Sequence, residues 1–231
     1  MPQAFRVVFA VYPGVTQLDF TGPHEVLSRL PGARCIVAST GGGSITAEGG
    51  LRFSDLARLR DVADCDLLCV PGGPGTAEAM GDAEFLAQLR RLAESARYLT
   101  SVCTGSLLLG AAGLLQGRRA ACHWAWRDRL ADFGAQPDAA RVVRDGHLYT
   151  GGGVTAGIDL ALRVIAEVAG PSCAQQVQLA IEYAPQPAFD CGRPEDADPA
   201  VLAAVSSRID SVRPARDEAI RSAAARLRPS R

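Results

Sequence analysis

The stretch TSVCTGSLLLGAAGLLQG (Thr100–Gly117) changes its hydrophobic pattern at a single cysteine. The apolar run Tyr98–Val102, which overlaps its start, has the length and composition of a buried strand. The leucine- and alanine-rich run Thr104–Leu115 has the pattern of a helix, and Gly117 follows it as a helix C-cap would. A strand that turns sharply into a helix, with Cys103 at the turn, is typical of a parallel sheet flanked by helices.

The same alternation of short apolar runs and helix-period segments extends to both sides of this stretch. We expect further strands at Arg6–Val11, Arg34–Ser39, Asp66–Val70, Arg119–Ala121 and Leu148–Thr150, with Arg141–Arg144 joined to the last through a tight turn. We expect further helices at Pro23–Leu30, Asp82–Ala96, Trp124–Phe133, Ala156–Ala169 and Ser172–Ile181. The predicted fold class is therefore α/β: a flavodoxin-like three-layer α/β/α sandwich around a mostly parallel sheet.

The character of the chain changes after residue 182. Residues 1–182 carry the alternating pattern and are expected to form one domain. Residues 183–231 begin with a proline-containing segment and continue in a final helix from about Pro199 to Leu227. This tail has few large apolar residues, so we expect it to pack on the domain or on a dimer partner.

Composition argues against several classes of partner. The 24 basic and 25 acidic residues give a formal net charge of -1 and are scattered, whereas nucleic-acid binding favours a basic stripe. We find neither a secretory signal nor an apolar run of membrane-spanning length, so we expect a cytoplasmic protein without membrane contact. Seven cysteines without paired metal-ligand spacing predict reduced thiols, with neither disulfides nor a zinc site.

Two interpretations of Cys103 are open. Free cysteine is commonly a small buried hydrophobe, and we interpret the other six cysteines in that way. At a strand-to-helix turn, however, the side chain is lifted clear of the sheet, and the helix N-terminus favours a thiolate by lowering the thiol pKa. This position favours a reactive role for Cys103.

Two further features fall on the same predicted sheet edge. Gly72 and Gly73 follow the strand Asp66–Val70, and ligands of open parallel sheets bind beyond the carboxyl ends of strands. Glycine N–H groups at this edge can face a reacting oxyanion, although such a loop is often only a turn. Asp19 follows the first strand between two apolar residues, which suits proton exchange, but it is equally suited to cap a helix.

His123 and Gly152 are expected near the same edge. His123 follows the predicted strand Arg119–Ala121, where it either supports the site or serves as a structural hydrogen-bonding group. Gly152 belongs to the run Gly151–Gly153, whose expected role is close backbone packing beside the site.

Together, Gly72-Gly73, Ser101–Gly105, His123 and Gly151–Gly153 resemble the PfpI superfamily, which has the class I glutamine amidotransferase-like fold. The resemblance runs from about Arg6 to Leu179 and is greatest to the isocyanide hydratases. It implies a homodimeric enzyme that adds water to a small-molecule isocyanide and gives an N-formamide. It also places the catalytic cysteine at Cys103, its acidic partner at Asp19 and a substrate-binding threonine at Thr104.

Cysteine and carboxylate chemistry accounts for such a reaction without a metal or an organic cofactor. We expect the Cys103 thiolate to attack the isocyanide carbon while Asp19 supplies a proton, which gives a covalent thioimidate. Water then adds, with Asp19 as the base, and the formamide is released. Gly72, Gly73 and Thr104 are expected to orient the substrate.

Two alternatives remain at this point. One is another cysteine-dependent activity of the superfamily, such as that of a glyoxalase, deglycase or amidase. The other is a non-catalytic ligand sensor or a redox sensor based on oxidation of Cys103. The QLDFTGP and SVCTG motifs also resemble the sensory domains of AraC-type regulators, but residues 183–231 leave no room for their DNA-binding domain.

Overall fold

A single eight-stranded sheet organises the computed structural model, which describes residues 4–227. Its strand order is β3-β4-β2-β1-β5-β6-β10-β9. The strands are β1 Phe5–Ala10, β2 Ala33–Ser39, β3 Gly43–Thr46, β4 Arg52–Arg58, β5 Leu67–Val70, β6 Tyr98–Val102, β9 Val142–Asp145 and β10 Leu148–Gly151. Pairing is parallel except at the two ends of the sheet, where β3 and β9 run antiparallel to their neighbours.

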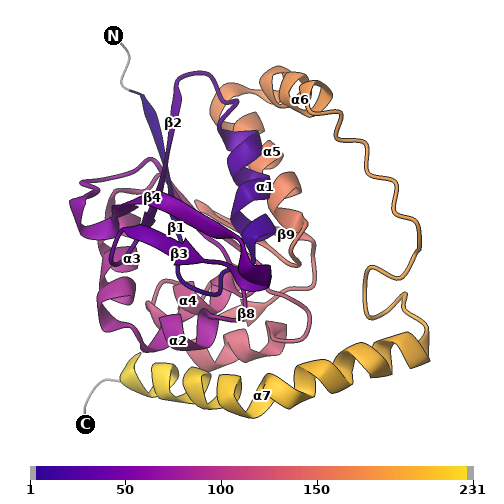
Figure 1. The fold of residues 1–231 in the computed structure, drawn as a ribbon. Coiled ribbons are helices and arrows are strands. Elements are labelled where there is room, and N and C mark those ends of the chain that lie inside the picture. Colours follow the sequence, from indigo (N-terminus) through magenta and orange to yellow (C-terminus); the bar gives the residue numbers. More distant parts are fainter. Residues whose placement is uncertain (1–3, 228–231) are drawn as a thin grey trace.

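Helices cover both faces of this sheet (Figure 1). One layer holds α1 Gln17–Leu27, α5 Ala156–Ala169 and α6 Pro171–Ala180; the other holds α2 Thr76–Gly81, α3 Ala83–Ser95 and α4 Gly105–Ala111. Strand β5 is buried along its full length and β1 along most of its length, as expected of apolar strands covered on both faces. The predicted three-layer α/β/α fold is confirmed.

Several predicted boundaries are wrong for identifiable reasons. Helix α1 begins at Gln17 and contains Pro23, which we expected at its start. Pro23 packs at the close crossing with α5, where a Cβ on Gly157 would lie 2.9 Å from the proline ring. Tertiary packing therefore outweighs the local preference of proline for a helix start.

Helix α4 is shorter than predicted. It ends at Ala111, and Gly113 has the left-handed φ of +78° that turns the chain away. Gly117 is therefore not its C-cap, although Gly117 also has a left-handed φ. The leucines beyond Ala111 pack into the core from turns, which a helical pattern in the sequence does not distinguish from a helix.

Around residue 120, the observed elements differ from the predicted ones in strand pairing and in helix type. The predicted strand Arg119–Ala121 is the short β7 Arg119–Ala120, which pairs with β8 Gln136–Pro137 outside the main sheet. The predicted helix Trp124–Phe133 is a 3-10 helix over Arg127–Phe133, labelled η3. Strands β3 and β4 and helix α2 have no counterpart among the predicted elements; β3 and α2 are short, whereas β4 has seven residues.

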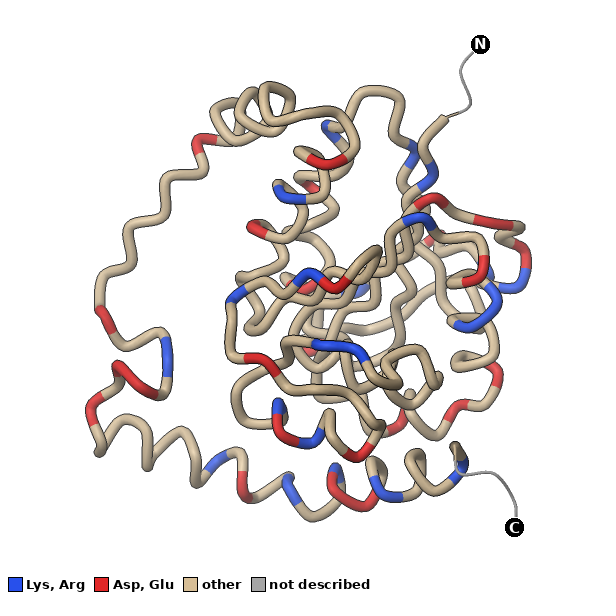
Figure 2. Tube along the Cα trace, turned by 180° about the vertical axis from the view of Figure 1, so that it is seen from behind, with Lys and Arg blue, Asp and Glu red and all other residues tan. Residues whose placement is uncertain are grey.

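The C-terminal helix α7, Pro199–Leu227, has the predicted bounds. It lies across α2, α4 and η3, and its buried residues are Ile220, Ala223 and Ala224 (Figure 1). Residues 183–198 form the extended, mostly exposed segment that leads to it. Basic and acidic residues are interspersed along α7 (Figure 2).

Candidate active site

Cys103 lies at the sharp turn between β6 and α4. Its φ is 57°, and it is one of three non-glycine residues in the left-handed region among residues 4–227. Such a conformation costs on the order of 1–3 kcal/mol and persists only where surrounding contacts impose it. One such contact is the hydrogen bond from the Cys103 N–H to the Gly151 carbonyl, at 3.0 Å.

Gly105 allows this turn to approach the neighbouring strand. A Cβ at Gly105 would lie 2.0 Å from the carbonyl oxygen of Val70, so no larger residue fits. The turn therefore brings the Cys103 side chain close to the loop that follows β5, while leaving the residue only 5% exposed. Cys103 therefore occupies the sharp turn that the sequence predicts, but it is deeply buried there.

Asp19 is a fully buried carboxyl group in the first turn of α1. Its Oδ2 accepts a hydrogen bond from the Gly72 N–H at 2.9 Å, whereas its Oδ1 has no hydrogen-bond partner within residues 4–227. Asp19 makes no helix-capping bond, so the capping alternative is wrong. One carboxyl oxygen is held in place and the other is available for proton exchange.

Burial raises the pKa of Asp19 to about 7, and the hydrogen bond from Gly72 opposes this shift only in part. Burial also raises the pKa of the Cys103 thiol, and the negative charge of Asp19 raises it further. The hydrogen bond from the Thr104 backbone lowers the thiol pKa, but its effect is smaller. Our expectation of a low thiol pKa is therefore wrong, because it considered the helix end without the desolvation.

Thr104 is held in a chain of buried hydroxyl groups. Its Oγ1 accepts a hydrogen bond from the Gly73 N–H at 2.9 Å and lies 2.9 Å from Oγ1 of Thr76. Thr76 donates to the Gly73 carbonyl at 2.6 Å, and Tyr12 donates to the Pro71 carbonyl at 2.9 Å. With those hydrogens committed, Oγ1 of Thr76 and the Gly73 carbonyl oxygen, at 3.4 Å, are the two acceptors for the Thr104 hydroxyl hydrogen.

Gly72 and Gly73 position these side chains. A Cβ at Gly72 would lie 2.5 Å from the Thr104 nitrogen, and one at Gly73 would lie 2.4 Å from the Thr16 nitrogen. Their N–H groups donate to Asp19 and Thr104, so both donors are used within the protein. In this arrangement the two glycines hold Asp19 and Thr104 in place.

A cavity of about 590 Å³ opens above the thiol. Cys103, Thr104 and His123 line it together with side chains of the C-terminal helix. His123 accepts a 3.3 Å hydrogen bond at Nδ1 from the Ala125 N–H, and burial lowers its pKa, which favours the neutral imidazole. Gly152 lines a neighbouring cavity that also touches His123.

Two residues of this cavity wall are not identified by the sequence patterns. Trp126 and Arg216 line it, with the guanidinium carbon of Arg216 4.7 Å from the centre of the Trp126 ring. No local motif distinguishes Arg216, because its place depends on where the tail returns to the domain. The cation–π contact with an aromatic residue far earlier in the chain can be seen only in the folded protein.

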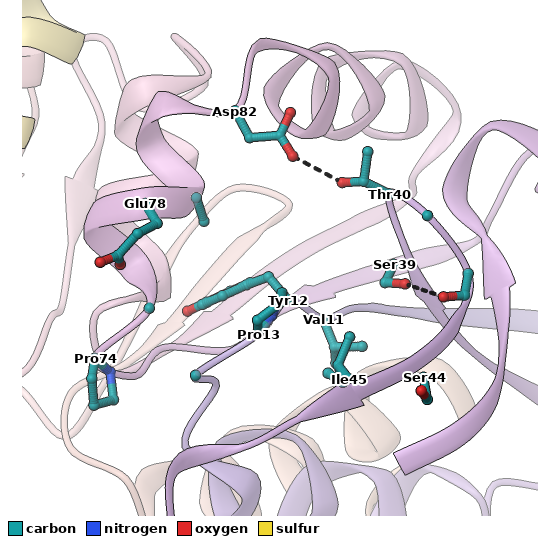
Figure 3. Close-up of a pocket in the computed structure, with 15 residues that line it drawn as sticks. Val11, Tyr12, Pro13, Ser39, Thr40, Ser44, Ile45, Pro74, Glu78 and Asp82 are labelled. Carbon is teal, nitrogen blue, oxygen red and sulfur yellow. Dashed lines mark hydrogen bonds between the residues drawn. The ribbon is translucent and has the colours of Figure 1, made fainter. Parts of the chain in front are cut away.

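A second cavity, of about 700 Å³, lies at the carboxyl ends of β1 and β2 (Figure 3). Tyr12 and Thr40 line it, and Thr40 donates a hydrogen bond to Asp82 at 3.2 Å. Pro74 and Glu78 line both cavities, so the segment after β5 separates them.

Within residues 4–227, no group of three or more His, Cys, Asp or Glu side chains is arranged to hold a metal ion. Among the same residues, no helix combines the length and apolar character needed to cross a membrane.

Comparison with known proteins adds to this geometry. The DJ-1/PfpI family model matches residues 5–167. The chain belongs to this family. It is 46% identical over 224 residues to the isonitrile hydratase of Pseudomonas putida, a match that covers 97% of this chain and 98% of that protein. The resemblance predicted from the motifs is confirmed.

Solved structures agree with this family assignment. A THiJ/PfpI family protein from Pseudomonas syringae superposes with a TM-score of 0.89 at 40% identity, covering 96% of this chain and 90% of that one. The regulator CdhR of Pseudomonas aeruginosa is 34% identical over 176 residues, which cover 73% of this chain but only 52% of the regulator. The match to the hydratase, unlike that to the regulator, extends over nearly the whole of both chains.

Proposed function

We propose that the protein is an isocyanide hydratase that forms a covalent thioimidate on Cys103. The observation that carries this proposal is the buried Asp19 carboxyl, which has one free oxygen and a pKa of about 7 and adjoins the thiol. A group with that pKa can both accept and donate a proton near neutral pH. The near full-length relative named isonitrile hydratase supports the choice of substrate, since isonitrile and isocyanide are the same functional group.

The first half of the reaction joins sulfur to carbon. Asp19 takes the thiol proton, and the Cys103 sulfur then uses its electron pair to attack the terminal isocyanide carbon. Asp19 returns the proton to the lone pair of that carbon, which yields a neutral thioimidate with an N=CH–S linkage. The raised pKa of the thiol suits this sequence, because the proton leaves only as the carboxylate receives it.

The second half consumes water. A water molecule adds to the thioimidate carbon as it loses a proton to Asp19, and Asp19 passes that proton to the nitrogen. The carbon–sulfur bond then breaks, and the hydroxyl group becomes the formamide carbonyl as the thiol regains its proton. The sum is one isocyanide plus one water to one N-formamide, with Cys103 and Asp19 restored.

Incubation with an aryl isocyanide and detection of the N-formamide test the proposal directly. Wild-type protein should turn over, and Cys103→Ala should not. Asp19→Asn should lower kcat/KM by about 10²–10⁴-fold, because it removes the acid–base group. Turnover of methylglyoxal or small amides without isocyanide hydration would favour another superfamily activity, and the absence of all turnover would favour a sensor.

We further propose that the protein is a homodimer. Leu179 in α6 and Phe189 within the extended segment 183–198 are 81% and 77% exposed in the single chain, and a second copy would cover them. Sedimentation at micromolar concentration should give a dimer, and a monomer would contradict this proposal.

A further inference from the structure

The C-terminal helix α7 supplies one wall of the cavity above Cys103. Ile209, Val212, Ala215 and Arg216 line the cavity from this helix, at the far end of the sequence from the thiol. Arg216 is the one permanently charged cation among the described residues that line it.

Arg216 holds the loop that positions Asp19 and Thr104. Its Nη2 donates to the carbonyl oxygens of Gly73 at 3.2 Å and of Pro74 at 3.0 Å. The Gly73 carbonyl also accepts from Thr76, so it is fixed from inside the domain and from α7 at once.

This loop needs such restraint because of its composition. Gly73 has a φ of +144° and no side chain that could anchor it. The same loop donates the N–H groups that hold Asp19 and Thr104. A change in the orientation of these peptides would therefore move the proton-exchanging and hydroxyl groups beside Cys103.

The charge of Arg216 also acts on the thiol. Arg216 and Cys103 line the same cavity, and a negative charge on Cys103 raises the pKa of Arg216, so a thiolate and the guanidinium attract each other across this cavity. Burial around Arg216 lowers its own pKa and limits the solvent screening of this interaction. The titratable groups near Cys103 or lining its cavity are Asp19 from α1, Tyr12 after β1, Glu48 from the loop before β4, Glu78 from α2, Cys122 and His123 after β7, and Arg216 from α7.

We infer that Arg216 is a positioning residue of the active site, which fixes the Gly73–Pro74 loop and stabilises the Cys103 thiolate by its charge. The kinetic part of this inference rests on the proposed hydratase function. The thiolate part does not, because it concerns the reactivity of Cys103 alone.

Arg216→Met is the variant that tests the inference, and Arg213→Met is its matched control. Both arginines lie over the Trp126 ring, at 5.1 Å for Arg213 and 4.7 Å for Arg216, but the Arg213 hydrogen bond that the structure describes goes to Asp210. Arg216→Lys keeps the charge while losing the planar guanidinium fork.

The first measurement is the pH dependence of Cys103 alkylation by iodoacetamide, with the other cysteines replaced by serine or alanine in all variants. Arg216→Met should raise the midpoint by about one pH unit, whereas Arg213→Met and Arg216→Lys should leave it within about 0.3 unit. The midpoint reports the thiol pKa even if the shorter side chain opens the cavity and raises the absolute rate.

The second measurement is isocyanide hydration. Arg216→Met should lower kcat/KM by about 10–100-fold through loss of positioning, and Arg216→Lys should recover part of this loss. A midpoint within about 0.3 pH unit of wild type together with a kcat/KM within about twofold of wild type in Arg216→Met would overturn the inference, as would equal effects in Arg213→Met. If wild-type protein hydrates no isocyanide but the midpoint still shifts in Arg216→Met alone, the proposed function fails and the role of Arg216 in stabilising the thiolate stands.

Discussion

At the residue scale, burial decides the chemistry of Cys103 and Asp19. The pattern change at Cys103 correctly indicates a strand, a turn and a helix, and these are local properties of the sequence. The direction of its pKa shift is not local, because it depends on how many distant residues exclude water from the thiol. The same holds for Asp19, whose partner is the backbone of Gly72, 53 residues away.

The buried Asp19 carboxyl should make stability depend on pH. Its pKa is about 7 in the folded protein and near 3.8 in the unfolded chain, so the folded state binds the extra proton between these values. Stability from this group is therefore present below about pH 4 and lost as the pH rises towards 7. The free energy of unfolding of wild type relative to Asp19→Asn should fall by roughly 2–4 kcal/mol between about pH 4.5 and 8.

Urea denaturation of both proteins at several pH values measures this difference. Glu25→Gln is the control, because it removes a carboxylate from an exposed position of the same helix. A constant difference between wild type and Asp19→Asn across this range would mean that the carboxyl is ionised throughout.

Gly72 should tolerate no side chain. In Gly72→Ala the new Cβ would lie 2.5 Å from the Thr104 backbone nitrogen and 2.9 Å from Oδ2 of Asp19, so backbone must shift. We expect kcat/KM for isocyanide hydration to fall at least about tenfold, since small displacements of catalytic groups are costly. Gly81→Ala, whose Cβ would meet no atom within 4 Å, should keep wild-type kinetics; equal kinetics in the two variants would contradict this close approach of Gly72 to Thr104.

At the element scale, helix ends show what local sequence can specify. Asp82, where the sequence predicts a helix to begin, is the N-cap of α3, and its Oδ1 accepts a hydrogen bond from the Phe85 N–H at 2.9 Å. Asp82→Ala should therefore lower the free energy of unfolding by about 1 kcal/mol, measured by thermal or urea denaturation. Glu84, in the same first turn, makes no such hydrogen bond among the contacts described. Glu84→Ala should therefore lower the free energy of unfolding by only about a few tenths of a kcal/mol. Equal losses in the two variants would argue against capping.

The helices α1 and α4 show the limit of such signals. Pro23 is a good starting residue for a helix, yet α1 begins earlier, at Gln17, because it packs on α5. The leucines after Ala111 keep a helical pattern, yet Gly113 ends α4. Short elements such as β3 and α2 give too few residues for a periodic pattern to be detected.

At the scale of the whole molecule, the tail completes the site. The bounds of α7 can be predicted from its alanine-rich composition, even though it contains Pro214. Its contact with the active-site loop cannot, because the extended segment 183–198 carries no signal for where it leads. Arg216 therefore enters the site only through the docking of α7 on α2, α4 and η3.

Releasing α7 from the domain should have the same effect on the active site as removing the Arg216 side chain. Ile220 is fully buried where α7 meets the domain, so Ile220→Asp places a charge in an apolar contact and should release the helix. Limited trypsin digestion should then cut within residues 199–227 faster than in wild type, while circular dichroism shows the domain still folded. The kcat/KM for isocyanide hydration should fall by about 10–100-fold, as in Arg216→Met, because the guanidinium no longer holds the Gly73–Pro74 loop.

Ser207→Asp, at an exposed position of the same helix, is the control for the added charge and should change neither measurement. If Ile220→Asp exposes α7 to trypsin without lowering kcat/KM, the helix docks without acting on the active-site loop. If both change together, the last helix of the chain is part of the active site and not an appendage, and the reactivity of Cys103 depends on a contact made across the full length of the fold.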